Sequence, residues 1–148
     1  MITTEQACAK MHDAAIKELG IHESGTATST ARIIEYDQHT ALKATSDHVA
    51  WCSSFINFIS DECSFPGTNS AAAINWLTWG KKLKEPILGC IVVLKRDDSQ
   101  NHNAAHVTLC DHPNIANGMI RCLGGNQSGG VKVSRYPTKN VLGYRSPI

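Results

Sequence analysis

Residues 47–58 read DHVAWCSSFINF, and the rest of the chain is organised around this stretch. Apolar side chains recur here at positions i, i+3, i+4 and i+7, a spacing that places side chains on one face of an α-helix. These side chains belong to Cys52, Phe55, Ile56 and Ile59. The pattern predicts a helix that turns this face, and the cysteine with it, toward the rest of the protein.

The start of this helix decides the environment of the cysteine. Asp47 is a residue type that caps helices, but a helix beginning there would place Cys52 beyond the first turn, with its amide already hydrogen-bonded within the helix. A start near Ala50 or Trp51 places Cys52 in the first turn. We favour this later start and expect the helix to end near Ser60.

A first-turn thiol has two properties that suit a nucleophile. The positive end of the helix dipole favours the thiolate, and the backbone amide of Cys52 is free to bind a developing oxyanion. A buried structural cysteine on an amphipathic helix gives the same pattern, and for a lone cysteine it is the commoner role. The choice therefore depends on whether the chain supplies partners for the thiol.

Length and composition describe an ordinary globular domain. The chain has 148 residues, 42% of them hydrophobic and 18% charged, so we expect one domain over residues 1–148. The net charge is +1 without a dominant basic patch, which argues against nucleic acid as a partner. No apolar run approaches the ~20 residues that cross a bilayer, and the first residues lack the pattern of a signal peptide.

The six cysteines form no Cys-x-x-Cys pair, so their spacing does not indicate a zinc ribbon. Several lie in apolar runs, which is typical of small apolar filler in a reducing compartment. A disulfide framework is not needed at this chain length.

Helical patterns fill the first half of the chain. Thr3 and Gln6 fit a capping box, and Gly20 suits the end of the helix that follows. A polar loop over 21–30 and a turn over 65–70 separate the helical segments. We expect helices over residues 4–19, 31–38, 50–60 and 71–79.

Strand patterns fill the second half. We expect strands over residues 87–94, 105–110, 119–123, 131–135 and 141–145, with a turn at 111–114 and a loop at 124–130. Helices that precede strands at hairpin spacing predict an α+β fold, in which helices pack on an antiparallel sheet.

A thiolate nucleophile needs a base within hydrogen-bond reach, and the base needs an orienting group. His106 is the best placed base, because it lies early in a strand among apolar neighbours, whereas His102 lies in a polar loop. The other histidines do not lie early in a predicted strand among apolar neighbours: His12, His22, His39, His48 and His112. For the orienting group we favour Asn126, which follows two glycines, with Asp111 as the alternative.

A zinc site built from His102, His106, Cys110 and His112 is the competing interpretation. Their spacing matches none of the helical zinc-hydrolase signatures, so we expect neither a metal nor another cofactor. Trp76 and Trp79 are three residues apart and therefore lie on one side of the predicted helix. They either pack in the core or form the wall of a sugar-binding groove.

Nine short segments carry a resemblance to a known family. They are ELGIHE (18–23), RIIEY (32–36), WCSSFIN (51–57), GTNSA (67–71), WLTWG (76–80), PILGCIVVL (86–94), HV (106–107), LGGNQ (123–127) and GYR (143–145). In this order the chain resembles the cell-wall cysteine amidohydrolases and peptidases of the NlpC/CHAP superfamily, especially the small phage and prophage members of the endolysin type. The family often has a glycine before the histidine and an acidic residue after the glycine of the first strand, where this chain has Ala105 and Cys90.

The resemblance implies a papain-like α+β fold and a peptidoglycan hydrolase. Cys52 would be the nucleophile, His106 the general base and Asn126 the residue that orients it. The substrate would be cut in its peptide stem, in its crosslink or at the sugar–peptide amide. Three further residues are assigned to substrate binding: Trp51, Trp76 and Gln127.

The resemblance also sets expectations about partners and location. A phage enzyme without a signal peptide would stay in the host cytoplasm, as a monomer, until a holin-like partner lets it reach the wall. An antibacterial effector delivered by a secretion apparatus would use the same chemistry. A catalytically silent wall-binding module and a zinc amidase are the alternatives from other classes.

Overall fold

The computed structural model describes residues 1–23, 26–46, 50–96 and 104–148. Three α-helices come first in the chain: α1 (Thr4–Ile16), α2 (Ala27–Asp37) and α3 (Cys52–Glu62). Six strands follow: β1 (Lys81–Leu83), β2 (Ile91–Lys95), β3 (Ala105–Ala116), β4 (Met119–Gln127), β5 (Gly130–Pro137) and β6 (Val141–Ser146). Two 3-10 helices complete the described elements: η1 (Ala73–Thr78) and η2 (Thr138–Asn140).

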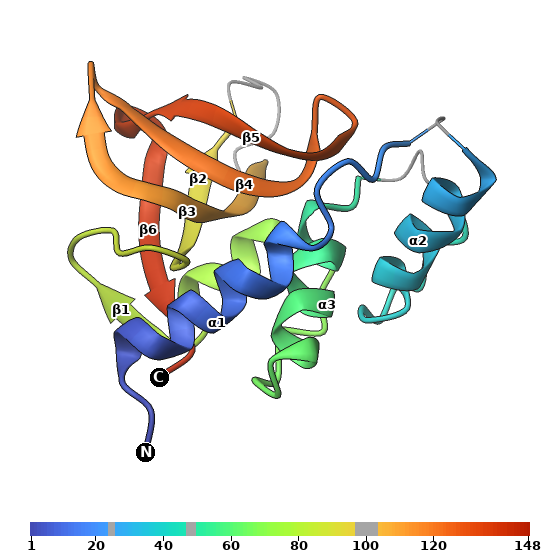
Figure 1. Cartoon of the computed structure of the whole chain (residues 1–148), viewed down its shortest axis with the longest axis horizontal. Helices are drawn as coiled ribbons and strands as arrows, with labels where there is room; N and C mark the ends of the chain where they lie inside the picture. Colours follow the sequence, from blue (N-terminus) through green and yellow to red (C-terminus); the bar gives the residue numbers. More distant parts are fainter. Residues whose placement is uncertain (24–25, 47–49, 97–103) are drawn as a thin grey trace.

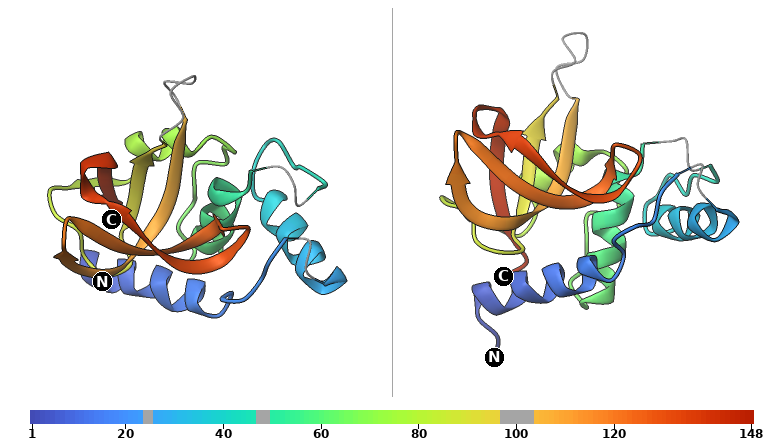
Figure 2. Two further views of the ribbon diagram at one scale, coloured as in Figure 1. Left: turned by 90° about the horizontal axis from the view of Figure 1, so that it is seen from above. Right: turned by 45° about the horizontal axis from the view of Figure 1, so that its top comes forward.

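The strands form one antiparallel sheet in the order β1-β6-β2-β3-β4-β5. Helices α1 and α3 pack against this sheet, and α3 contacts β3 and β4 (Figure 1). Helix α2 packs on α3, on the side away from the sheet, as two further views show (Figure 2). The architecture is α+β, and α3 lies between the sheet and α2.

Two groups of buried side chains stabilise this arrangement. The larger one joins α3 to the sheet and includes Phe55, Ile56, Ile59, Val107 and Leu109. The helical face predicted from the sequence does pack in this group, but all residues 52–60 of α3 are buried, because α2 covers another side of the helix. The smaller group contains strand residues of opposite orientation, such as Val92 and Cys110, together with Cys8 of α1, Cys90 and Cys122. All six cysteines are unpaired and buried.

The helix ends follow their capping residues. The side chains of Thr3 and Gln6 form the predicted capping box, with N···O distances of 2.9 and 3.1 Å. Helix α2 begins at Ala27, inside the predicted loop, because the Thr26 hydroxyl caps the amide of Ser29 at 3.2 Å. The helix predicted over 71–79 is the 3-10 helix η1.

The prediction of a turn at 111–114 is wrong. Strand β3 continues through these residues to Ala116, and the hairpin turns at Asn117 and Gly118. Both residues have positive φ angles, of 55° and 69°, as a two-residue Asn-Gly hairpin turn requires. The short strand β1 was not predicted, because its exposed lysines show no apolar alternation.

Candidate active site

Helix α3 begins at Cys52, which confirms the expected later start. Trp51 occupies the N-cap position with φ of −127°, and its side chain provides no capping hydrogen bond. Amides of the first helical turn have no acceptor within a helix. The amide of Cys52 therefore has no acceptor within its own helix. Asp47, the other candidate cap, lies outside the described residues.

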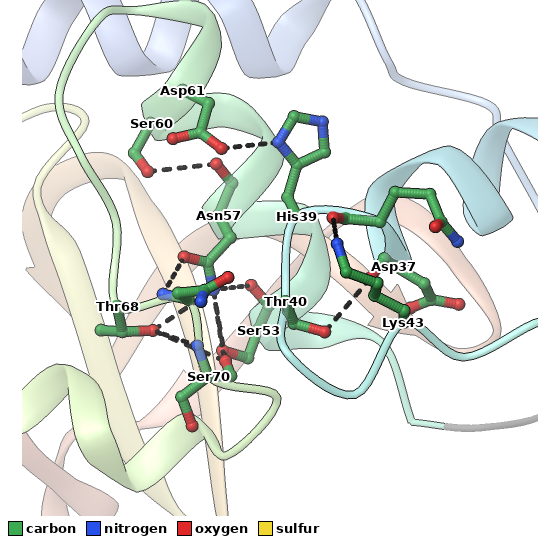
Figure 3. Close-up of polar contacts among 12 residues, drawn as sticks. Asp37, His39, Thr40, Lys43, Ser53, Asn57, Ser60, Asp61, Thr68 and Ser70 are labelled. Atoms are coloured by element: carbon green, nitrogen blue, oxygen red, sulfur yellow. Dashed lines mark hydrogen bonds and ion pairs between the residues drawn. The ribbon is translucent and has the colours of Figure 1, made fainter.

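A polar network holds the first turns of α3 against the loop before η1 (Figure 3). The Ser53 hydroxyl donates to the Ser70 carbonyl at 2.6 Å and accepts from the Trp76 indole at 2.8 Å. The Asn57 side chain donates to the same Ser70 carbonyl at 3.2 Å and accepts from the amide of Asn69 at 2.9 Å. The residue after the cysteine is thus fixed from two directions.

His106 is the second residue of β3 and is buried, with 6% of its surface exposed. Its Nε2 lies 3.1 Å from Oε1 of Gln127 and 3.3 Å from the Tyr136 hydroxyl. The Gln127 amide is itself fixed, because its Nε2 donates to the carbonyls of Lys132 and Cys122 at 2.7 and 3.3 Å. Its Oε1 also accepts from the Thr108 hydroxyl at 2.7 Å.

These contacts determine the tautomer of the histidine. Since the amide nitrogen of Gln127 faces two carbonyls, its oxygen faces the imidazole and accepts a hydrogen bond from Nε2–H of His106. The neutral ring then carries its lone pair on Nδ1. Gln127 therefore holds His106 in the tautomer whose basic nitrogen is Nδ1.

The thiol of Cys52 is tuned by its surroundings. Burial raises the pKa of Cys52, but the hydrogen bond and charge of His106, the backbone at Val107 and the charge of Arg96 outweigh burial and lower that pKa from 9.0 to about 7. Near neutral pH, a large fraction of this thiol is therefore the nucleophilic thiolate.

A pocket of about 480 Å³ opens beside the histidine and is lined in part by His106, Gln127 and Tyr136. Cys52 retains 4% exposure and is not among the lining residues. His106 therefore forms part of the wall of this pocket, whereas the sulfur of Cys52 lies behind it.

The assignment of Asn126 as orienting residue is corrected to Gln127. The register of β4 against β5 shifts between Gly124 and Gln127, and Asn126 lies there with φ of 58°. One extra residue in a strand reverses the alternation of side chains beyond it. Gln127 consequently takes the face that meets His106, and Asn126 lies at the bulge inside β4.

The alternative, Asp111, lies farther along β3 and serves another histidine. Its carboxylate contacts His12 at 2.7 Å and Arg121 at 2.7 Å. It therefore does not orient His106.

The predicted substrate contacts of Trp51 and Trp76 are also wrong, because both side chains are fully buried. Trp51 stacks on Tyr36 and donates to Glu23 at 3.2 Å, while Trp76 donates to Ser53. Amphipathic rings of this kind suit a core or a groove wall equally well, so sequence could not decide between them. Gln127 does line the pocket, but its amide is committed to the histidine and to backbone carbonyls.

Tyr136 and Thr108 were missed. Each is an ordinary strand residue whose role appears only when β3, β4 and β5 are paired. The alternation of β3 could have indicated Thr108, which lies two residues from His106 and therefore on the same face.

The zinc interpretation lacks a ligand set in the described part of the chain. Within residues 1–23, 26–46, 50–96 and 104–148, no three His, Cys, Asp or Glu side chains are grouped to hold a metal ion. Cys110 packs in the smaller core group, and His112 caps the amide of Asn114 at 3.2 Å. His102 and His48 lie outside the described residues.

Comparisons with the models of known protein families, with curated proteins and with solved structures gave no match. None of the helices in the described segments has the length and apolarity needed to cross a bilayer.

Proposed function

We propose that the chain is a cysteine hydrolase with a papain-like active site, and that it cleaves an amide bond of peptidoglycan. The observation that carries the proposal is the interaction of Cys52, at the first position of α3, with an imidazole whose other nitrogen is held by Gln127. Nucleophile, base and orienting group are the three parts that such chemistry needs.

The reaction would proceed by acyl transfer. The Cys52 thiolate attacks the amide carbonyl carbon, and the negative charge that develops on the carbonyl oxygen is stabilised by the backbone amide of Cys52. The protonated His106 gives its Nδ1 proton to the leaving amine as the C–N bond breaks. His106 then takes a proton from water, which attacks the thioester and releases the carboxylic acid and the thiolate.

The choice of peptidoglycan rests on the resemblance of the nine sequence segments to endolysin-type enzymes. An exported phage enzyme and a secreted antibacterial effector share this chemistry, and either would act as a monomer on the same polymer. A silent wall-binding module has no use for a thiol with a lowered pKa beside an oriented imidazole, so we favour the enzyme.

Clearing of purified peptidoglycan suspensions, followed by mass spectrometry of the released fragments, tests this function. The wild-type chain should release fragments with a new amine and a new carboxyl group, and a thiol alkylator should stop the reaction. Cys63→Ala is the matched control, since Cys63 is also buried on this helical segment but lies at its far end. Inhibition by a chelator with insensitivity to the alkylator would instead support a zinc amidase.

A further inference from the structure

The segment that follows α1 pairs with the hairpin that carries Gln127, the residue that positions His106. Residues 20–23 run antiparallel to the start of β5, and the amide of Glu23 donates to the Gly129 carbonyl at 2.8 Å (Figure 1). The next residue of the hairpin, Gly130, pairs with this segment on one side and with Gln127 on the other. The backbone of Glu23 is therefore fixed to the hairpin that orients the imidazole.

The side chain of Glu23 contacts the start of α3. Nε1 of Trp51, the N-cap residue of this helix, donates to Oε2 of Glu23 at 3.2 Å. Trp51 directly precedes Cys52, and its carbonyl accepts a hydrogen bond from the amide of Phe55 at 3.0 Å, which closes the first turn of the helix. Glu23 thus connects the residue before the nucleophile with the β4–β5 hairpin.

The indole that Glu23 holds is closely packed. Trp51 is fully buried, and its ring lies so near β4 that a Cβ at Gly125 would come within 2.7 Å of it. Tyr36 of α2 stacks on the same indole, with ring centroids 5.9 Å apart. A bulky ring packed in this way moves together with the backbone that carries it, because protein interiors leave little free space. The place of the indole therefore sets the place of the backbone next to Cys52.

We propose that Glu23 positions Cys52, by holding the start of α3 against the hairpin that orients His106. Its side chain acts on the sulfur side through Trp51, and its backbone acts on the imidazole side through Gly129. Both halves of the reacting pair then share one support. The expected effect on turnover rests on the proposed hydrolase function, whereas the expected effect on the thiol does not.

A positioning role and a simple charge effect predict opposite changes in the thiol. If Glu23 acted only through its negative charge, its removal would favour the thiolate and lower the pKa of Cys52. If Glu23 positions Cys52, its removal weakens the contact with His106 that offsets burial and lowers this pKa from 9.0 to about 7, so the pKa rises. Glutamine separates the two effects, since it carries no charge but keeps an oxygen that accepts from the indole.

The pH dependence of Cys52 alkylation, measured together with peptidoglycan cleavage, tests the proposal. Glu23→Ala should move the alkylation midpoint upward, toward 9.0, and should lower kcat about 10-fold, as expected for the loss of a hydrogen bond to a charged group. Glu23→Gln should keep the midpoint and kcat close to wild type. Glu85→Ala, which removes an exposed carboxylate from another loop, is the control and should change neither.

A double-mutant cycle with Trp51→Phe tests the route of the effect. Trp51→Phe removes the indole donor and should raise the midpoint by itself, and Glu23→Ala should add no further shift in that chain. Additive shifts would overturn the route through Trp51. An unchanged or lowered midpoint in Glu23→Ala would overturn the positioning role and leave the hydrolase intact. If no chain cleaves peptidoglycan but the midpoint still depends on Glu23, the hydrolase fails and the positioning of Cys52 stands.

Discussion

Two buried histidines of this protein contact polar partners on the sheet, and only one of them has the surroundings of a catalytic base. His12 of α1 contacts Asp111 of β3, whose second oxygen binds Arg121. His106, at the start of the same strand, contacts the amide of Gln127 and faces a thiol. The first site is a polar network of His12, Asp111 and Arg121 that ties a helix to the sheet. The second leaves one ring nitrogen for a reacting group and opens onto a pocket.

The comparison shows that a buried histidine with a carboxylate partner is not by itself a catalytic arrangement. Asp111 would be the stronger orienting group by charge, yet its oxygens are committed to His12 and Arg121. The neutral amide of Gln127 can hold the imidazole because its own donors are fixed by two backbone carbonyls. Access and a nucleophile, rather than the strength of the hydrogen bond, distinguish the two histidines.

The largest expected effect is on the reacting pair. Cys52→Ala and His106→Ala should each reduce peptidoglycan cleavage by about 10³-fold or more, because each removes a group that forms or breaks a bond. Circular dichroism should show an unchanged fold. Near-normal cleavage by either variant would contradict the assignment.

A smaller effect is expected at the positioning residue. Gln127→Ala removes a hydrogen bond to an imidazole that becomes charged, a loss of about 1.5–3 kcal/mol, or about 10- to 100-fold in kcat. Asn126→Gly, which tolerates the φ of 58° at this position, is the matched control and should change kcat little, since its neighbour makes the contact. If Asn126→Gly were the more damaging change, the assignment of Gln127 as the contact of His106 would be wrong. A pH–rate profile that shifts in Gln127→Ala distinguishes positioning from a general loss of structure.

The smallest effect on activity is expected at the other histidine. His12→Ala should lower the free energy of unfolding by about 1–3 kcal/mol, because it breaks the contact between α1 and β3. Cleavage per folded molecule should stay close to wild type. Urea unfolding combined with the peptidoglycan assay checks both statements. A variant that is stable but inactive would show that His12 contributes to cleavage and not to stability.

The places of Cys52 and His106 in the fold could be predicted from local patterns. Helical spacing placed Cys52 at the start of a helix that packs on the sheet, and apolar neighbours placed His106 in a strand that meets this helix. The orienting residue could not be predicted, because a single extra residue near Asn126 moves the contact to Gln127. Tyr136 lies thirty positions beyond the histidine and reaches it only through the pairing of three strands.

In the fold as well, features set by neighbouring residues could be predicted from the sequence, whereas features set by distant residues could not. The capping box at Thr3 and the helix face of α3 were predictable from neighbouring residues. The end of β3 was not, because Pro113 suggested a turn, whereas the hairpin forms at Asn117 and Gly118, where both residues adopt positive φ. The helix predicted over 71–79 has 3-10 geometry, and its Trp76 contacts Ser53, a residue distant in sequence.

The rate at which Cys52 is alkylated as a function of pH tests the central claim most directly, because it requires no substrate. In the wild-type chain the rate should rise with a midpoint near pH 7, since the pKa of this thiol is lowered to about 7. In His106→Ala the midpoint should move to the ordinary value of 9.0 or above, because burial then acts without the imidazole to offset it. Peptide mapping identifies the labelled cysteine. The same midpoint in both chains would show that sulfur and imidazole do not interact, and the proposed enzyme would lose its basis.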